Sequence, residues 1–286
     1  MAPATDPKSL RATLRFSRFA QRALGARPEL ADEIDTADLA GWDRLAMERF
    51  LAAQRFADAD GLATTLRALR ERVLLRLAVR DLAGIASLDE VHVTMSDLAD
   101  VALQTAHGYW SETLEREIGV PTAPNGARQS LVVIGMGKLG GRELNVSSDI
   151  DLIFLYSEDG ETRGARAMAN EAFFARLGQR IISTLNDRTA DGFVFRVDMR
   201  LRPWGDGGPL ATSFGAFENY LVIHGREWER YAWIKARVIT GDPAHATELH
   251  SLVRPFVYRR YLDYGAIGSL RDLHAQIRSE VARRDF

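Results

Sequence analysis

Residues 130–156, SLVVIGMGKLGGRELNVSSDIDLIFLY, decide how this chain folds. An apolar run leads into a glycine-rich turn, and a short polar segment then leads to Asp149-Ile150-Asp151, which opens a second apolar run. Short apolar runs bounded by turn residues are typical of buried strands. A strand that ends in a glycine-rich turn is in turn typical of sites that bind phosphate groups, and two classes of such site have to be compared.

The first class is the dinucleotide-binding βαβ unit. Gly135, Gly137 and Gly140 match G-x-G-x-x-G after a strand-like run, and Asp151 stands roughly where a ribose-binding acid would be expected. A parallel βαβ unit needs a crossover of about a dozen residues or more, most of them helical. Only Arg142–Ser148 lie between the glycines and the acids, so this class is disfavoured.

The second class binds metal and phosphate together, as nucleotidyltransferases do. In an extended chain alternate side chains share a face, so Asp149 and Asp151 point the same way while Ile150 points into the opposite layer. Two carboxylates so close repel each other unless a cation lies between them, which favours a divalent metal ion. The structural alternative is a simple turn, since Asp is common in turns.

A second segment, residues 193–202 (FVFRVDMRLR), alternates as a half-buried strand does. Asp198, Arg200 and Arg202 fall on its polar face together with Val194 and Arg196. One acid flanked by arginines suits a site where the carboxylate binds Mg²⁺ and the guanidinium groups neutralise phosphate oxygens. A solvent-exposed face with cross-strand ion pairs is the other interpretation.

Together the two segments offer three carboxylates, those of Asp149, Asp151 and Asp198. If the segments are neighbouring strands, this is the minimum set for a two-metal site that catalyses an in-line displacement at phosphorus.

The same motifs resemble those of the bacterial bifunctional glutamine synthetase adenylyltransferase/adenylyl-removing enzyme family. The resemblance extends over roughly residues 130–270 and is carried by a set of motifs: GKLGGREL (137–144), SSDIDLIF (147–154), FRVDMRLRP (195–203), GDGGP (205–209), GREWERYA (225–232) and RPFV (254–257) followed by RRY (259–261). Within that family, these motifs look like the N-terminal, adenylyl-removing half.

The resemblance implies an α+β nucleotidyltransferase (polymerase-β-like) fold with a small mixed sheet, preceded and followed by helical segments. It makes Asp149, Asp151 and Asp198 the catalytic metal ligands, for two Mg²⁺ ions or alternatively Mn²⁺. It also gives a nucleotide- and phosphate-binding set: Gly140, Gly141, Lys138, Ser148, Arg200 and Arg202.

The implied reaction is phosphorolysis of the adenylylated tyrosine of glutamine synthetase, which yields ADP and the free tyrosine. Two alternatives stay open: transfer of AMP from ATP to a protein, and a non-catalytic module that docks glutamine synthetase or a PII-type signal protein. Labelled AMP on unmodified glutamine synthetase would indicate the first, and failure to bind Mn²⁺ through the three acids would indicate the second. A PII-type protein is also an expected partner of the full-length enzyme.

Composition agrees with an ordinary cytoplasmic protein of 286 residues, with 46% hydrophobic positions and a formal charge of −2. The absence of cysteine excludes disulfides and thiolate metal sites, and the six histidines form no pair at zinc-ligand spacing. The near-neutral charge argues against a nucleic-acid partner. No apolar run is long enough to span a membrane.

Proline and glycine residues at the boundaries predict four regions: a helical region (1–118), a linker rich in proline and glycine (119–129), a catalytic core (130–240) and a C-terminal helical segment (241–286). The catalytic core is expected to include a helix over 168–185 between the two acidic strands. Because the family has a second nucleotidyltransferase domain, we expect this chain to be a fragment, an engineered piece or the product of an incomplete gene.

Overall fold

The computed structural model describes residues 14–34, 40–164 and 167–258, together with isolated positions 268, 271, 275, 278, 279 and 283. The chain divides into two compact units, each assembled from three stretches. Unit 1 comprises Met1–Leu114, Gly141–Ile150 and Leu177–Asp198. Unit 2 comprises Glu115–Gly140, Asp151–Arg176 and Met199–Phe286.

Unit 1 is mainly helical, as the first part of the sequence predicts. Its helices are α2 (Arg18–Ala26), α3 (Leu30–Ile34), α4 (Arg44–Ala52), α5 (Ala59–Leu82) and most of α6 (Leu88–Ile118). Asp58 begins α5 as an N-cap whose side chain accepts a hydrogen bond from the Gly61 N–H at 2.8 Å. Leu75 and Val79 of α5 are buried against Leu30 and Ile34, so burial of apolar side chains holds α3 to α5.

Unit 2 contains the sheet. Its elements are β1 (Val120–Thr122), β2 (Val132–Gly135), α7 (Gly137–Gly140), β4 (Glu161–Arg163), the 3₁₀ turn η1 (Gly205–Gly207), β6 (Ala211–Ser213), α9 (Phe214–Ile223), α10 (Glu227–Ile234), β7 (Arg237–Thr240), α11 (Pro243–Val257) and all but the first residue of β3 (Ile150–Tyr156). Strand β2 pairs antiparallel with β3 and β7, whereas β6 pairs parallel with β3. The sheet is therefore mixed, as predicted.

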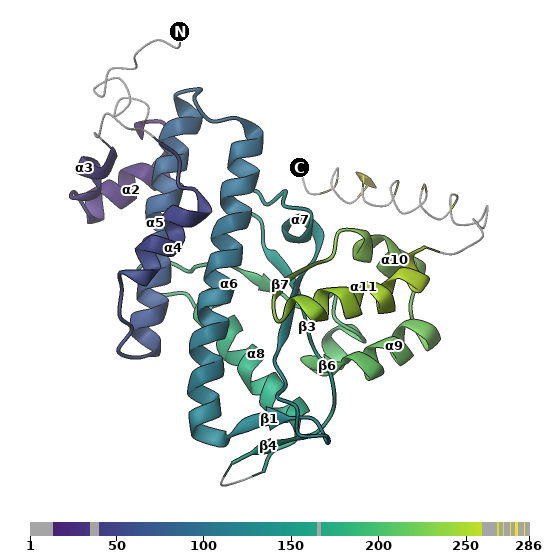
Figure 1. Cartoon of the computed structure of the whole chain (residues 1–286). Helices are drawn as coiled ribbons and strands as arrows, with labels where there is room; N and C mark the ends of the chain where they lie inside the picture. The colour runs from purple at the N-terminus through teal and green to yellow at the C-terminus, as the bar shows by residue number, and fades with distance from the viewer. Residues whose placement is uncertain are drawn as a thin grey trace. The chain divides into compact units, whose positions relative to one another are not determined.

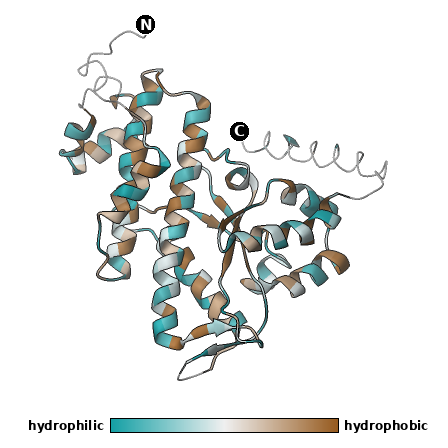
Figure 2. Cartoon of the chain, in the orientation of Figure 1, coloured by the Kyte–Doolittle hydropathy of each residue, from teal (hydrophilic) through white to brown (hydrophobic). Residues whose placement is uncertain are grey.

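Helices α9, α10 and α11 cover one face of this sheet (Figure 1). The side chains buried there come from alternate strand positions and from the three helices: Val132, Ile134, Ile153, Leu155, Phe217, Trp233, Leu249 and Val253. Figure 2 shows the strands as the most continuously hydrophobic part of this unit. Burial on both faces explains why β2, and β3 after Asp151, read as uninterrupted apolar runs in the sequence.

The predicted helix over 168–185 is confirmed as α8 (Asn170–Asn186), which begins in unit 2 and ends in unit 1. Within unit 2, Phe174 at its start stacks on Tyr156 of β3 with ring centroids 4.8 Å apart. Within unit 1, Thr184 accepts a hydrogen bond from the indole N–H of Trp110 at 2.8 Å.

The prediction that residues 193–202 form one strand is wrong. Only β5 (Val197–Asp198) is extended and paired, and Val194 is fully buried although the alternation places it on the polar face. The N–H groups of Val194 and Phe195 both donate to the carbonyl of Leu185, each at 2.9 Å. The segment therefore wraps the end of α8 before it becomes extended, which breaks the two-residue period.

The stretch 119–129, predicted as a linker, contains β1, and the polar stretch that follows β3 contains β4. These two strands pair antiparallel, with Pro121 opposite Thr162. After β7, Asp242 begins α11 as an N-cap ahead of Pro243, which gives a helical segment where one was predicted. After residue 258, most of the helical segment predicted over 241–286 lies outside the described residues.

Among the helices in the described part of the chain, none combines the length and the apolar content that crossing a bilayer requires.

Candidate functional site

The glycine turn lies at the end of β2 in unit 2. Its first part is tied to β3, because the Met136 N–H donates to the Asp151 carbonyl at 2.9 Å. Gly137 has φ +53°, a left-handed conformation that favours glycine. A Cβ at this position would lie 2.8 Å from Oδ2 of Asp151. The turn therefore leaves space for the Asp151 carboxylate, one of the three predicted metal ligands.

Gly140, predicted to face the nucleotide, is buried and packed on both sides by backbone. A Cβ there would lie 2.0 Å from the carbonyl oxygen of Lys235, and its own N–H donates to Met136 O at 3.0 Å. Arg237 donates to the carbonyls of Leu139 and Gly140 at 3.1 and 3.4 Å, which satisfies the C-terminal end of the single-turn helix α7. Close packing accounts for this glycine, and its role in nucleotide binding stays a prediction.

Of the other residues in the predicted turn, Lys138 is exposed. Gly141 and Ser148 belong to unit 1, where both are half-buried. The role of these three residues in phosphate binding stays a prediction.

In unit 1, Asp149 is held by an arginine. The Nε of Arg196 donates to the Asp149 carboxylate, and its terminal nitrogen donates to the Ser147 carbonyl at 2.6 Å. The backbone supports this pair, because the Ile150 N–H donates to the Arg196 carbonyl at 2.9 Å. The Asp149 side chain remains 47% exposed, so one side of its carboxylate is open to a ligand.

The polar segment before Asp149 is anchored on α6 by residues that unit 1 buries. Arg142 forms ion pairs with Asp97 at 2.8 Å and with Asp100 at 3.5 Å. Close by, the Leu144 N–H donates to Oγ of Ser96 at 3.3 Å. These contacts explain why α6 buries two carboxylates and a hydroxyl, and they fix the approach of the chain to Asp149.

Asp198 lies in β5, directly after the Arg196-Val197 segment, and is half-buried. It belongs to unit 1 with Asp149, whereas Asp151 belongs to unit 2. Within the described ranges, no three His, Cys, Asp or Glu side chains are grouped closely enough to hold a metal ion. The donor chemistry nonetheless suits Mg²⁺, which prefers carboxylate oxygens and retains several water ligands. The metal assignment remains a prediction.

Arg200 and Arg202 line one pocket of about 530 Å³ in unit 2. Arg202 is committed to its own loop, since it donates to the Met199 carbonyl at 2.9 Å and pairs with Asp206 at 3.3 Å. Trp204 adopts φ +59°, unusual for a non-glycine residue, and its ring packs edge-on against Tyr220 with centroids 4.7 Å apart. Arg200 is exposed, so it is the more accessible of the two predicted phosphate contacts.

The floor of this pocket contains a buried hydrogen-bond network. Tyr220 donates to Glu229 at 2.6 Å, and the other oxygen of Glu229 accepts the Arg226 N–H at 2.7 Å. Burial, followed by the hydrogen bond to Glu229, raises the pKa of Tyr220 to about 12. The network holds the start of α10 against α9.

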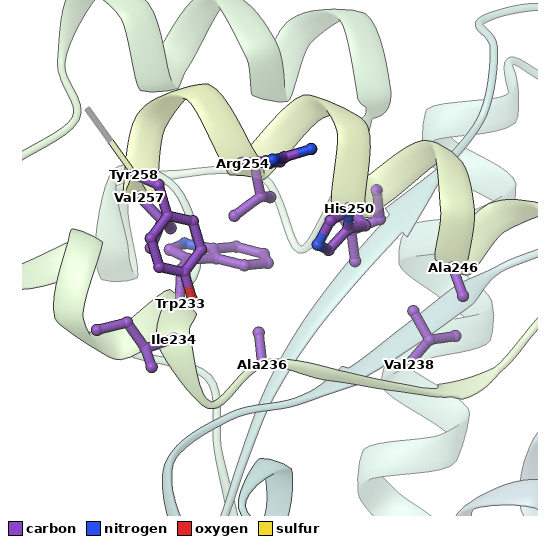
Figure 3. Close-up of a pocket in the computed structure, with 11 residues that line it drawn as sticks. Trp233, Ile234, Ala236, Val238, Ala246, His250, Arg254, Val257 and Tyr258 are labelled. Carbon is purple, nitrogen blue, oxygen red and sulfur yellow. The ribbon is translucent and has the colours of Figure 1, made fainter. Parts of the chain in front are cut away.

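A second pocket in unit 2, of about 340 Å³, lies between α11 and the segment from Trp233 to Val238 (Figure 3). The indole of Trp233 forms much of its wall, and the rim includes His250, Arg254 and Tyr258. None of the predicted site residues lines it.

Sequence reasoning missed Arg196, the partner of Asp149, and the two acids that anchor Arg142. Arg196 could have been found, because it lies in the FRVDMRLRP motif on the same predicted face as Asp198. Asp97 and Asp100 carried no local signal, since they lie within a helix and meet Arg142 only through tertiary structure.

The architecture, a small mixed sheet with helices before and after it and a glycine turn beside an acidic strand, is that of an α+β nucleotidyltransferase-like protein. A model of the glutamate-ammonia ligase adenylyltransferase family (GlnE) matches residues 8–251. The chain belongs to this family.

Three similar proteins are each described as a bifunctional glutamine synthetase adenylyltransferase/adenylyl-removing enzyme. Those of Chromobacterium violaceum and Aromatoleum aromaticum are both 52% identical to this chain, over 285 and 279 residues. That of Burkholderia mallei is 51% identical over 292 residues. The matches cover 99, 98 and 98% of this chain but only 31, 29 and 32% of those proteins, so the chain spans about a third of their length.

Proposed function

We propose that this chain removes AMP from an adenylylated tyrosine of glutamine synthetase by metal-dependent phosphorolysis. Similarity to proteins described as having both adenylyl-transferring and adenylyl-removing activities supports glutamine synthetase as the substrate. The motifs resemble the adenylyl-removing half, and this supports the direction of the reaction. The structural observation that carries nucleotidyl chemistry is the space that Gly137 leaves for the Asp151 carboxylate beside the turn.

The proposed reaction is a displacement at the α-phosphorus. An oxygen of inorganic phosphate forms a new bond to this phosphorus, and the bond from phosphorus to the tyrosine oxygen breaks. The products are ADP and tyrosine, whose oxygen takes up a proton. No side-chain nucleophile is required, so catalysis depends on positioning and on stabilising the charge that gathers around phosphorus.

In this proposal Asp149, Asp151 and Asp198 hold the metal ions. Mg²⁺ bound there would neutralise phosphate oxygens and the leaving oxygen. Arg196 keeps the Asp149 carboxylate in place, while the segment anchored by Arg142 fixes the backbone before it. Arg200 contributes a positive charge for phosphate from the loop after β5.

The decisive experiment incubates the chain with adenylylated glutamine synthetase, phosphate and Mg²⁺, and measures ADP. We expect ADP only when phosphate and metal are both present, and at least a hundredfold slower release from Asp198→Ala. Normal turnover in an Asp149→Asn/Asp151→Asn double variant would refute the assignment of the acids. Labelled AMP appearing on unmodified glutamine synthetase would show transfer in the forward direction instead.

Expected partners follow from the same proposal. They are adenylylated glutamine synthetase and inorganic phosphate as substrates, with ADP as a product. A PII-type signal protein would act on the full-length enzyme.

A further inference from the structure

Three arginines of unit 1 surround the ring of Phe193, and we call this group the Phe193 cluster. The guanidinium carbons of Arg70, Arg188 and Arg196 lie 4.9, 5.9 and 5.8 Å from the ring centroid. Arg70 comes from the middle of α5, Arg188 follows the end of α8, and Arg196 precedes β5. Segments far apart in the sequence thus bring three positive charges to one side chain.

The charges of the cluster are poorly balanced within the described residues. Arg196 has a carboxylate partner in Asp149, but neither Arg70 nor Arg188 is paired with an acid in the described part of the chain. The Nε of Arg70 is buried and has no hydrogen-bond partner there. Burial, and then the charge of Arg196, lowers the pKa of Arg70, so its charged form is disfavoured where it stands.

Two other arginines of this unit are each paired with an acid. Arg27 pairs with Glu71 at 2.5 Å and Arg80 pairs with Glu90 at 2.6 Å. Arg180 provides the comparison for a ring contact, because it lies alone over Trp110 at 5.0 Å and is exposed. A single exposed cation over a ring is a common and stable arrangement, whereas three around one ring repel each other.

We propose that the Phe193 cluster binds a phosphate group. Planar guanidinium groups match phosphate oxygens geometrically and keep their charge on partial burial, so arginines gathered in this way suit a multiply charged oxyanion. Its identity as the inorganic phosphate consumed in phosphorolysis rests on the proposed function, whereas the anion site itself does not. Through Arg196, the bound anion would share a partner with Asp149.

The test measures binding directly, without turnover. Isothermal titration of the full chain with inorganic phosphate is carried out in EDTA at constant ionic strength, so that no metal site contributes. Parallel titrations with AMP and ADP distinguish free phosphate from the phosphate of a nucleotide. The variants are Arg70→Gln and Arg188→Gln, and Arg180→Gln is the matched control with a single arginine on a single ring.

We expect each cluster variant to weaken phosphate binding about tenfold or more, which is the loss of a charge-assisted hydrogen bond. Arg180→Gln should bind as the unmodified chain does. Without phosphate, Arg70→Gln should melt at the same or a higher temperature, because a buried unpaired charge is removed. Arg188 is exposed, so its replacement tests the site even if the Arg70 variant folds poorly.

Phosphate affinity within twofold of the unmodified value in both cluster variants would overturn the inference. A chain that binds AMP or ADP through these arginines but not inorganic phosphate would keep the anion site and refute its assignment to free phosphate. If ADP release proceeds in both variants with an unchanged KM for phosphate, the Phe193 cluster is not the phosphate site and the proposed function still stands. Phosphate binding to the cluster without any ADP release would instead refute the function and keep the site.

Discussion

The Asp151 carboxylate occupies space that only a glycine at position 137 leaves free, since a Cβ there would lie 2.8 Å from Oδ2 of Asp151. The backbone at this glycine is also left-handed, with φ +53°. We expect Gly137→Ala to lower the free energy of unfolding by about 1–2 kcal/mol, because a Cβ is disfavoured in this conformation. Displacement of the carboxylate should lower ADP release more strongly than the loss of stability explains. Urea unfolding and the ADP assay measure the two effects.

Gly215 provides the control in the same unit. It lies in the first turn of α9 with nothing within 4 Å of an added Cβ. We expect Gly215→Ala to leave activity unchanged and to raise stability by up to about 1 kcal/mol. Equal stability of the two alanine variants would contradict the account of Gly137.

Arg142 keeps two carboxylates of α6 neutralised. Its side chain is 39% exposed, but those of Asp97 and Asp100 are only 10 and 2% exposed. We expect Arg142→Ala to cost about 2 kcal/mol, less than a fully buried pair, because Asp97 loses its partner whereas Asp100 keeps Arg44 at 3.7 Å. Arg128→Ala, which breaks an exposed pair with Glu115, should cost less than about 1 kcal/mol. Restoration of stability by adding Asp97→Asn to Arg142→Ala would confirm the cause, and no recovery would count against it.

The hydrogen bond from Tyr220 to Glu229 predicts a pH dependence. An unfolded tyrosine loses its proton near pH 10, whereas burial and the bond to Glu229 raise the pKa of Tyr220 to about 12. Between these values the unfolded state binds fewer protons than the folded state, so stability falls as the pH rises from about 10 to 12 and is unaffected below.

Replacement of Tyr220 by Phe isolates this effect. The variant should lose about 1–2 kcal/mol at pH 7, because Glu229 is left with one partner fewer. Its stability should also decline less steeply above pH 10. Unfolding in urea at pH 8, 10 and 11 gives both results, and identical slopes for the variant and the unmodified chain would contradict the assignment to Tyr220.

The predicted metal site should appear in thermal unfolding. Mg²⁺ or Mn²⁺ at a hundred times its dissociation constant would stabilise the chain by about 2.7 kcal/mol, and EDTA should reverse the shift. We expect no shift in Asp149→Asn/Asp151→Asn. The matched control is Asp60→Asn/Asp89→Asn, which neutralises two exposed acids in helix first turns and should respond as the unmodified chain does. A full metal response in the first double variant would place the ion elsewhere.

The sequence predicts those elements whose signal is local. The apolar runs of β2 and β3 are visible because both strands are buried on both faces. Strands β1 and β4 have three residues each, too few for a period to be recognised. Residues 193–202 alternate by type, but capture of two backbone N–H groups by Leu185 interrupts the strand.

The same distinction holds for the candidate site. The acids of the Asp149-Ile150-Asp151 segment were found because they stand two residues apart beside a glycine turn. Arg142 and Asp97 are separated by 45 positions, and Arg70 and Phe193 by more, so no window of sequence contains either pair. The anchoring of the acidic segment and the Phe193 cluster therefore required the tertiary structure.

The interleaving of the two units limits how the protein can be dissected. Because the chain passes from one unit to the other before Glu115, Gly141, Asp151, Leu177 and Met199, no single cleavage or terminal truncation isolates either. One of these passages is the peptide bond between Ile150 and Asp151, within the acidic segment itself. Genetic separation of this region should therefore proceed by point substitution, since no single deletion removes one unit and leaves the other whole.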